Sequence, residues 1–143
     1  MINSVLVVCT GNICRSPIGE GLLAIRAPRI KVSSAGVGAM VGWPADELAV
    51  AVMNDRGHDI AAHRARQLTR AMLAETDLVL TLDQHHSDWI NGRFPEYRGK
   101  VHKILRWQNN ADVPDPYRQP KAAFEESYRL IDSGISDWLK RLA

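Results

Sequence analysis

The sequence is poor in cysteine and in aromatic residues, and it has no large excess of charge of one sign. Only 2 of its 143 residues are cysteine, so the chain is not a disulfide-stabilised scaffold. The formal net charge is +2 and the basic residues form no long run, which argues against a nucleic-acid-binding protein. Any affinity for anions must therefore come from a local site.

Long apolar segments are also missing from the sequence. The first apolar run covers only residues 5–9, which is too short for the core of a signal peptide or for a membrane-spanning helix. We therefore expect a cytoplasmic protein that does not insert into a membrane. With 143 residues, of which 45% are hydrophobic, the chain predicts a single domain over residues 1–143 that buries its own core.

Short apolar segments alternate with amphipathic segments along the chain. The apolar segments predict strands near residues 5–9, 30–34, 78–82 and 101–105. The amphipathic segments predict helices near residues 17–26, 47–56, 70–75, 84–92 and 124–142. Ser16 is the expected N-cap of the first helix, and Gly134 is expected to weaken the last one slightly. This order predicts an α/β fold with one open, twisted, four-stranded parallel sheet and helices on both faces.

Residues 5–17 combine a strand, a tight loop and the start of a helix. Cys9 ends the strand, Arg15 follows after five residues, and Ser16 and Pro17 open the helix. Such a loop directs backbone N–H groups inward and adds the positive end of a helix dipole, so it predicts an anion-binding site. In open parallel sheets, ligands bind at the carboxyl ends of the strands, where this loop begins. Cys9 is expected to be held there as a thiolate.

The spacing between Cys9 and Arg15 suits chemistry on a phosphate monoester. The guanidinium of Arg15 can hold two phosphate oxygens in a bidentate fork while Cys9 attacks the phosphorus in line. The hydroxyl of Ser16 is expected to hydrogen-bond the sulfur. Gly11 and Asn12 suit the positive φ angles that an inward-turned loop needs. The arginine and the loop amides stabilise the charge, so neither a metal nor an organic cofactor is expected.

A phosphatase also needs a general acid, because the attack expels an alkoxide or phenoxide. Asp115 is the predicted acid, since Pro114 and Pro116 stiffen the long polar loop that carries it. Once ionised, the same carboxylate is expected to activate the water that hydrolyses the intermediate. Tyr117 can stack on an aromatic leaving group. Asp112 is the competing acid, but a loop aspartate that caps a turn is the favoured interpretation.

Two sequence motifs, VCTGNICRS at residues 8–16 and DPY at residues 115–117, together resemble the low-molecular-weight protein tyrosine phosphatase family. The likeness also includes residues 34–36 and 62–67, so it covers essentially the whole chain. It is strongest to the bacterial members that dephosphorylate tyrosine kinases of capsule and exopolysaccharide assembly. The resemblance implies a phosphotyrosine phosphatase I-like fold with strand order 2-1-3-4. It also implies a tyrosine-phosphorylated protein as partner, expected to be a membrane-anchored bacterial tyrosine kinase.

The resemblance assigns roles to the residues of the first loop. It implies that Cys9 is the nucleophile, Arg15 the phosphate clamp and Asp115 the acid and base. The implied phosphate-binding loop consists of Thr10, Gly11, Asn12, Ile13, Cys14, Arg15 and Ser16.

The resemblance also names residues that support this loop. It implies that a strained Asn12 is braced by hydrogen bonds with Ser16, Ser34 and His63. From the residues alone, His63 is only a loop histidine with a surface or structural role.

The resemblance further predicts the walls of the substrate pocket. Met40 stands where many animal members have a tryptophan, and Trp43 lies nearby in the sequence. Tyr117 is followed by Arg118, where those enzymes often have a second aromatic residue. Both differences are typical of the polysaccharide-associated bacterial subgroup, and we expect Arg118 to favour acidic sequence around the phosphotyrosine.

The Cys9–Arg15 spacing also fits two other functions. A thioredoxin-coupled arsenate reductase passes a disulfide along three cysteines, and this chain has only Cys9 and Cys14. A catalytically weak module that binds phosphorylated residues is the remaining alternative, although the predicted nucleophile, clamp and acid are all present. Adjacent His85 and His86 point to different sides of a helix, which favours a solvated face over a metal site.

Cys14 supports two interpretations. A reversible disulfide with Cys9 would make the enzyme redox-sensitive and protect the nucleophile from irreversible oxidation. Alternatively, Cys14 is simply a small buried residue.

Overall fold

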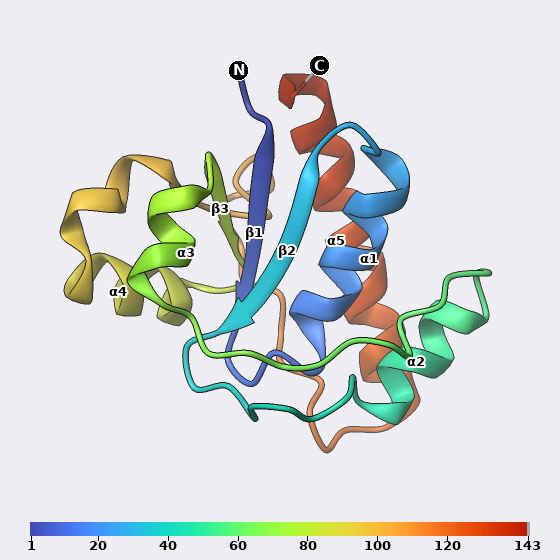
Figure 1. The fold of residues 1–143 in the computed structure, drawn as a ribbon. Coiled ribbons are helices and arrows are strands. Elements are labelled where there is room, and N and C mark those ends of the chain that lie inside the picture. The colour runs from blue at the N-terminus through green and yellow to red at the C-terminus, as the bar shows by residue number, and fades with distance from the viewer. Residues whose placement is uncertain (143) are drawn as a thin grey trace.

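The computed structural model describes residues 1–142. The strands are β1 (Ser4–Cys9), β2 (Lys31–Gly36), β3 (Leu78–Thr81) and β4 (Val101–Lys103). The helices are α1 (Arg15–Arg26), α2 (Glu47–Asn54), α3 (Arg70–Glu75), α4 (Gln84–Arg93), the 3-10 helix η1 (Pro95–Lys100) and α5 (Lys121–Leu142). The strands form one parallel sheet in the order β2-β1-β3-β4, which confirms the predicted fold class and strand order (Figure 1).

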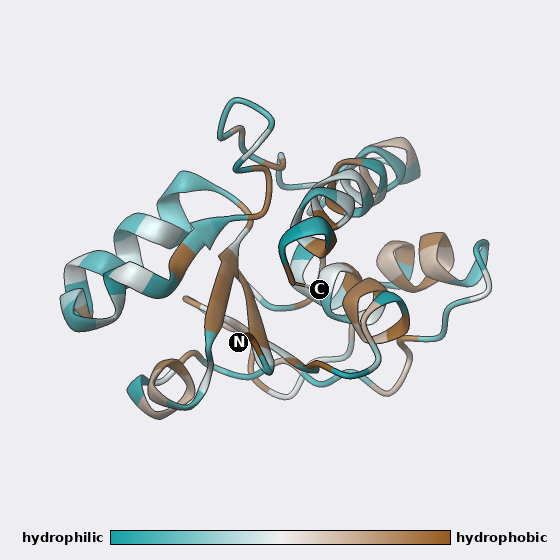
Figure 2. Cartoon of the chain, turned by 90° about the horizontal axis from the view of Figure 1, so that it is seen from above, coloured by the Kyte–Doolittle hydropathy of each residue, from teal (hydrophilic) through white to brown (hydrophobic). Residues whose placement is uncertain are grey.

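Helices cover both faces of this sheet. Helices α1, α2 and α5 lie on one side and α3 and α4 on the other (Figure 1). Each face of the sheet carries its own hydrophobic core. Along β1, Val5 and Val7 pack into the core under α1, α2 and α5, whereas Leu6 and Val8 pack into the core under α3 and α4. Seen from above, brown, hydrophobic strand segments lie between helices that carry teal, hydrophilic segments (Figure 2). A strand buried on both faces has a continuous apolar sequence, and this is why β1 and β3 could be predicted from the sequence.

Helix α5 closes the larger core with the apolar stripe that the sequence predicted. Phe124, Ile131 and Ile135 on this stripe are fully buried. Gly134 has a packing role, because a Cβ atom at this position would lie 2.8 Å from the carbonyl oxygen of Ile104. This glycine therefore lets α5 approach the chain closely just after β4.

Some predicted boundaries were wrong by a few residues. The N-cap of α1 is Cys14, so Ser16 lies inside the helix and does not cap it. The backbone turns into the helix earlier because the side chains of Arg15 and Ser16 are both directed to the site at its N-terminus. Strand β2 continues to Gly36, and β4 already ends at Lys103.

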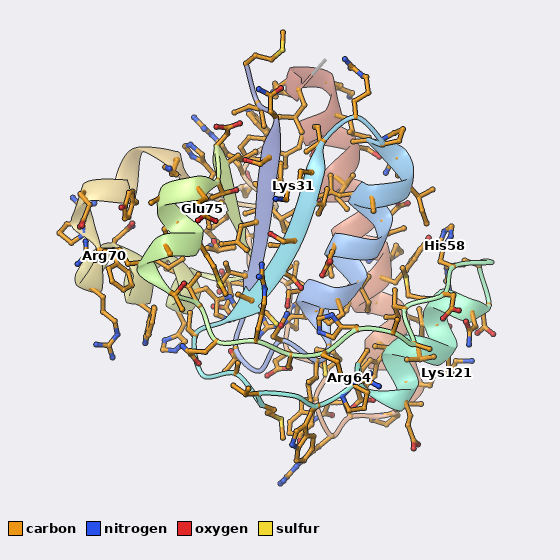
Figure 3. All side chains as sticks on the ribbon, viewed as in Figure 1. Lys31, His58, Arg64, Arg70, Glu75 and Lys121 are labelled. Carbon is orange, nitrogen blue, oxygen red and sulfur yellow. The ribbon has the colours of Figure 1, made fainter. Side chains whose placement is uncertain are left out.

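Charged side chains lie mainly on the outside of the molecule (Figure 3). Lys121 at the start of α5 binds Asp55 beyond α2 at 2.8 Å, and Arg70 of α3 pairs with Glu96 of η1. Exposed pairs of this kind contribute at most about 1 kcal/mol each. Within residues 1–142, no helix is both long enough and apolar enough to cross a membrane.

Candidate active site

A cavity of about 140 Å³ lies at the carboxyl end of β1. It brings together the predicted nucleophile, phosphate clamp and acid, although Asp115 is far from Cys9 in the sequence. The residues that line it are Cys9, Thr10, Gly11, Ile13, Cys14, Arg15, Gly38, Met40, Asp115 and Tyr117.

The backbone of the first loop is held from outside the cavity. The carbonyl groups of residues 9–13 accept hydrogen bonds of 2.7–3.0 Å, in order, from Val37, Gly38, Met40, His63 and Asp46. The N–H of a trans peptide points opposite to its C=O, so the N–H groups of this loop point toward the cavity. Together with the N-terminus of α1 they form an anion cradle. The sequence did not predict that residues 37–46 fasten this cradle.

The side chain of Asn12 braces the loop from below. Asn12 is fully buried with φ 59°, a left-handed conformation that costs about 1–2 kcal/mol in most residues. Its Nδ2 donates to Ser16 Oγ at 2.7 Å and to Ser34 Oγ at 2.9 Å, and its Oδ1 accepts from the Arg66 N–H at 2.9 Å. These bonds offset the strain. Gly11, also expected at positive φ, does not adopt it.

Cys9 lies at the floor of the cavity with only 2% of its surface exposed. Its Sγ is 2.8 Å from Ser16 Oγ. The serine oxygen already accepts a hydrogen bond from Asn12, so its own hydrogen is free to point to the sulfur. A hydroxyl donated in this way stabilises a thiolate.

Cys14 is also buried, and both thiols are free. Burial raises the pKa of Cys14, and the nearby Asp46 carboxylate and Cys9 raise it further. Cys14 is therefore a protonated thiol at neutral pH. The protective disulfide stays a prediction.

The guanidinium of Arg15 has one anchored edge and one more open edge. Its Nη1 donates to Asp83 Oδ2 and to the carbonyl oxygen of Val113, both at 2.8 Å. Its Nη2 has longer contacts, 3.5 Å to Thr10 Oγ1 and 3.8 Å to Asp115 Oδ2. Partial burial favours the protonated form of Asp83, but the hydrogen bond and charge of Arg15, together with the contacts of His86, outweigh it and lower the pKa of that carboxyl. Arg15 is thus oriented before any anion binds.

The backbone directly before Asp115 is anchored at two consecutive residues. The N–H of Val113 donates to the carbonyl oxygen of Leu82 at 2.8 Å, and Ser127 Oγ donates to the carbonyl oxygen of Pro114. The Asp115 side chain itself is 52% exposed at the cavity mouth. The backbone is therefore fixed, while the carboxylate can reach a substrate.

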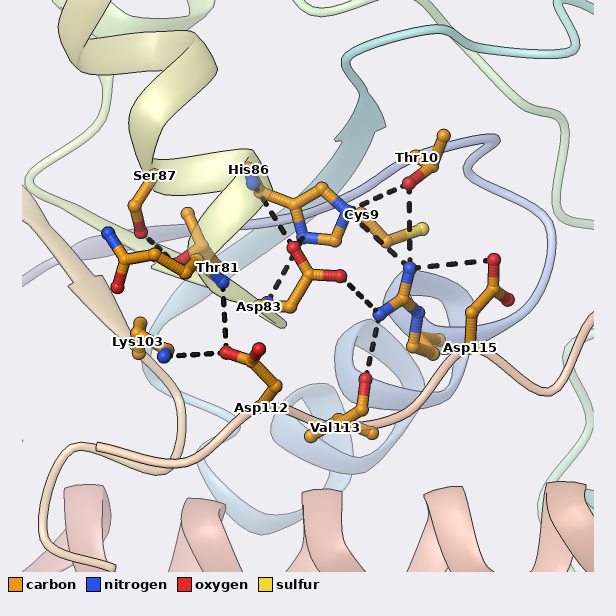
Figure 4. A network of polar contacts seen from close by, with 12 residues as sticks. Cys9, Thr10, Thr81, Asp83, His86, Ser87, Lys103, Asp112, Val113 and Asp115 are labelled. Carbon is orange, nitrogen blue, oxygen red and sulfur yellow. Dashed lines mark hydrogen bonds and ion pairs between the residues drawn. The ribbon is translucent and has the colours of Figure 1, made fainter. Parts of the chain in front are cut away.

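Asp112, the competing acid, is engaged elsewhere. Its Oδ1 lies 2.6 Å from Lys103 Nζ and accepts a hydrogen bond from the Gln84 N–H at 3.0 Å (Figure 4). It does not line the cavity. Asp112 therefore has a structural role, but it binds partners that are distant in the sequence and does not cap a local turn as predicted.

The prediction for His86 was wrong. His86 is fully buried, and its Nε2 lies 2.9 Å from Thr10 Oγ1. It stands three residues after Asp83, the N-cap of α4, and forms a capping box with it. That spacing was visible in the sequence and is the signal that could have placed His86 inside.

The residues predicted to form the pocket walls divide into two groups. Met40 and Tyr117 line the cavity. Trp43 is 53% exposed and does not line it. Arg118 lies outside as well, with its guanidinium 5.3 Å from the centre of the Tyr117 ring.

This cradle can hold a tetrahedral anion directly above a sulfur nucleophile, at the edge of a parallel sheet where such folds bind their ligands. Fold and site together define the class of cysteine-dependent phosphatases. Residues 4–143 match the sequence profile of the low molecular weight phosphotyrosine protein phosphatases, and the chain belongs to that family.

Individual relatives agree with this assignment. The chain is 44% identical to the low molecular weight protein-tyrosine-phosphatase Etp of Escherichia coli K12, over 99% of this chain and 95% of the relative. It is 43% identical to the probable low molecular weight protein-tyrosine-phosphatase AmsI of Erwinia amylovora, over 100% and 99% of the two chains. The structure of Vibrio vulnificus Wzb in complex with benzylphosphonate superposes with a TM-score of 0.95 at 40% identity, covering 99% of both chains.

Proposed function

We propose that this phosphatase hydrolyses phosphotyrosine with Cys9 as nucleophile, Arg15 as phosphate clamp and Asp115 as acid and base. The observation that carries the proposal is the meeting of these three side chains at one cavity whose loop carbonyls all point outward. A preorganised set of donors of this kind stabilises the charge on a transferring phosphoryl group.

In the first step, the Cys9 thiolate attacks phosphorus and the bond to the tyrosyl oxygen breaks. Asp115 donates its proton to that oxygen, so tyrosine leaves as a neutral phenol. The phosphoryl group is then bonded to the sulfur, with its oxygens held by the open edge of Arg15 and the loop N–H groups. The product of this step is a phosphocysteine.

In the second step, the ionised Asp115 takes a proton from a water molecule that attacks the phosphorus. The sulfur–phosphorus bond breaks, inorganic phosphate is released and the thiolate returns. The hydrogen bond from Ser16 stabilises the sulfur as it leaves. Asp115 ends the cycle protonated, ready for the next substrate.

The cavity walls favour an aromatic phosphate ester. Met40 and Tyr117 offer apolar and aromatic surface to a phenyl ring. Trp43 and Arg118 lie outside the cavity, so we assign them contacts with residues that flank the phosphotyrosine. The benzylphosphonate held by the Wzb relative supports an aryl group in this pocket.

The physiological substrate that we propose is a tyrosine-phosphorylated protein, specifically a membrane-anchored bacterial tyrosine kinase that controls exopolysaccharide or capsule synthesis. The family resemblance supports this choice, and it implies that the phosphatase works in the cytoplasm. Capture of phosphoproteins from the native cell with a Cys9→Ser or Asp115→Ala variant tests it. Recovery of proteins that carry no phosphotyrosine contradicts it.

The catalytic roles are tested by turnover of p-nitrophenyl phosphate and of a phosphotyrosine peptide. Cys9→Ser is expected to reduce turnover by at least about 10⁴-fold, because the nucleophile is lost. In the wild type, rapid denaturation during turnover followed by mass spectrometry should find the phosphoryl group on the peptide that contains Cys9. A folded, reduced wild type that binds the phosphopeptide without hydrolysing it would instead establish the binding module.

A further inference from the structure

One buried group beside the cavity has no role in the mechanism above. His86 on α4 is fully buried, and its Nε2 faces Thr10 Oγ1 at 2.9 Å (Figure 4). Thr10 directly follows the nucleophile Cys9 and lines the cavity. The pair therefore joins α4 to the phosphate-binding loop.

The hydrogen bonds of the His86 ring define its tautomer. The backbone N–H of Asp83 donates to Nδ1 at 3.2 Å. Asp83 Oδ1 also lies 3.3 Å from Nδ1, but it already accepts the backbone N–H of His86, so we place the ring proton on Nε2. Burial lowers the pKa of His86 to about 4, and the neighbouring charge of Arg15 acts in the same direction, against the opposite effect of Asp83. The ring is therefore neutral at physiological pH.

A neutral ring with its proton on Nε2 must donate to Thr10. The other close group is Arg15 Nη2, 3.5 Å from both Thr10 Oγ1 and His86 Nε2, and it is also a donor. Thr10 Oγ1 thus receives hydrogen bonds from the side of His86 and Arg15. Its own hydrogen has no acceptor on that side and turns toward the open cavity.

We propose that His86 is a positioning residue that turns the Thr10 hydroxyl into a hydrogen-bond donor to the bound phosphoryl group. The inference rests on the proposed function, because it requires that the cavity holds that group. Thr10 then adds a side-chain donor to the loop N–H groups and the open edge of Arg15. His86 acts only through Thr10 and does not touch the substrate.

The hydroxyl is tested with inorganic phosphate, measured by titration calorimetry, and with p-nitrophenyl phosphate. Thr10→Val keeps the shape and removes the hydroxyl, so phosphate affinity and kcat/KM should each fall about tenfold, the scale of one hydrogen bond to a charged group. Thr10→Ser should restore most of the loss. Phosphate affinity and kcat/KM of Thr10→Val within about twofold of wild type would overturn the proposal.

The role of His86 is tested by a double-mutant cycle with Thr10. In His86→Asn the amide oxygen can replace Nδ1 at the helix cap, but the side chain does not reach Thr10. This variant should lose about as much kcat/KM as Thr10→Val, and the double variant no more than the stronger single one. If the loss of kcat/KM in the double variant equals the product of the two single losses, His86 only supports the helix. His85→Asn, on the exposed side of α4, is the matched control and should be unchanged.

Nuclear magnetic resonance of the wild type decides the direction of the hydrogen bond without any variant. Nitrogen–proton correlations of the His86 ring should show the neutral Nε2–H form at pH 7. The Nδ1–H form would reverse the bond and overturn the inference. A wild type that has this tautomer but neither binds phosphate nor hydrolyses the ester would refute the proposed function instead.

Discussion

The loop that we propose binds phosphate and the segment that carries the proposed acid, Asp115, are built differently. In the loop at residues 9–16, Asn12 and Ser16 are fully buried and Arg15 is 2% exposed. In the segment at residues 112–118, the side chain of Asp115 is 52% exposed. The first region is fixed through both its backbone and its side chains, whereas the second is fixed mainly through its backbone.

The chemistry explains this difference. Donors that stabilise charge on a phosphoryl group are most effective when they do not reorganise during the reaction. An acid that also serves as a base must approach a leaving oxygen first and a water molecule later. A rigid cradle and a reachable carboxylate satisfy these two requirements separately. Substitutions in the cradle should therefore lower both phosphate binding and the stability of the fold. Substitutions of Asp115 should slow only the chemical step.

The largest effect is expected for Arg15→Lys. Lysine offers no planar fork, so kcat/KM for p-nitrophenyl phosphate should fall by about 10³-fold. The melting temperature should fall as well, because the partly buried Asp83 carboxylate and the buried Val113 carbonyl lose their donor. Arg26→Lys, at the far end of α1, is the control and should preserve both values. A loss of activity below about tenfold would show that the guanidinium does not clamp the phosphate.

A smaller effect, confined to chemistry, is expected for Asp115→Asn. Turnover of a phosphotyrosine peptide should fall by about 10²-fold, and turnover of p-nitrophenyl phosphate should fall less because its leaving group needs little protonation. The melting temperature should not change, since the carboxylate is half exposed. Asp112→Asn is the matched control. Equal losses in the two variants would assign the acid elsewhere.

Low pH should decrease the stability of the folded protein, because His86 must be protonated in its buried position. Its pKa is lowered to about 4 in the folded protein, so the unfolded chain binds this proton at a higher pH, near 6.5. The free energy of unfolding should therefore decrease from pH 6.5 toward pH 4, by at most about 1.4 kcal/mol per pH unit for one proton. Urea unfolding at pH 7 and pH 5 measures this change.

His86→Asn separates this contribution from that of other groups. Burial also lowers the pKa of His102, which adds a loss in the same direction. The lowered pKa of Asp83 adds a loss only near and below its ordinary value, about pH 4. The variant should show a flatter dependence between pH 7 and pH 5 than the wild type. Identical slopes would contradict the assignment to His86.

The smallest effect is expected for Lys103→Met, which releases the acid-bearing segment at one point. Lys103 Nζ binds Asp112 and the carbonyl oxygen of Asn110, both at 2.6 Å. The bonds of Val113 remain, so turnover of the phosphotyrosine peptide should fall only about threefold through a small misplacement of Asp115. Steady-state kinetics measures it. A loss as large as that of Asp115→Asn would mean that this segment is not held by its backbone.

Much of the fold was predictable because the two central strands, β1 and β3, are buried on both faces. Continuous apolar runs marked β1 and β3, and the stripe from Phe124 to Leu142 marked α5. Asp46, Thr69 and Asp83 each stand directly before a predicted helix and cap it in the structure. The prediction of Ser16 as the N-cap of α1 was wrong. Its hydroxyl contacts the sulfur of Cys9, and a rule based on local capping preference does not include that contact.

The sequence by itself determined the phosphate-binding loop, because a strand end, a short loop and a helix start are contiguous and form a cradle from local backbone geometry. Only the tertiary structure decided what fixes that loop and completes the site. Asp83 and His86 follow the end of β3. Val113 and Asp115 lie in a loop after β4, and residues 37–46 follow β2. Their contacts with the cradle depend on how the strands are ordered and how the helices pack, and no periodicity within a single segment encodes that arrangement.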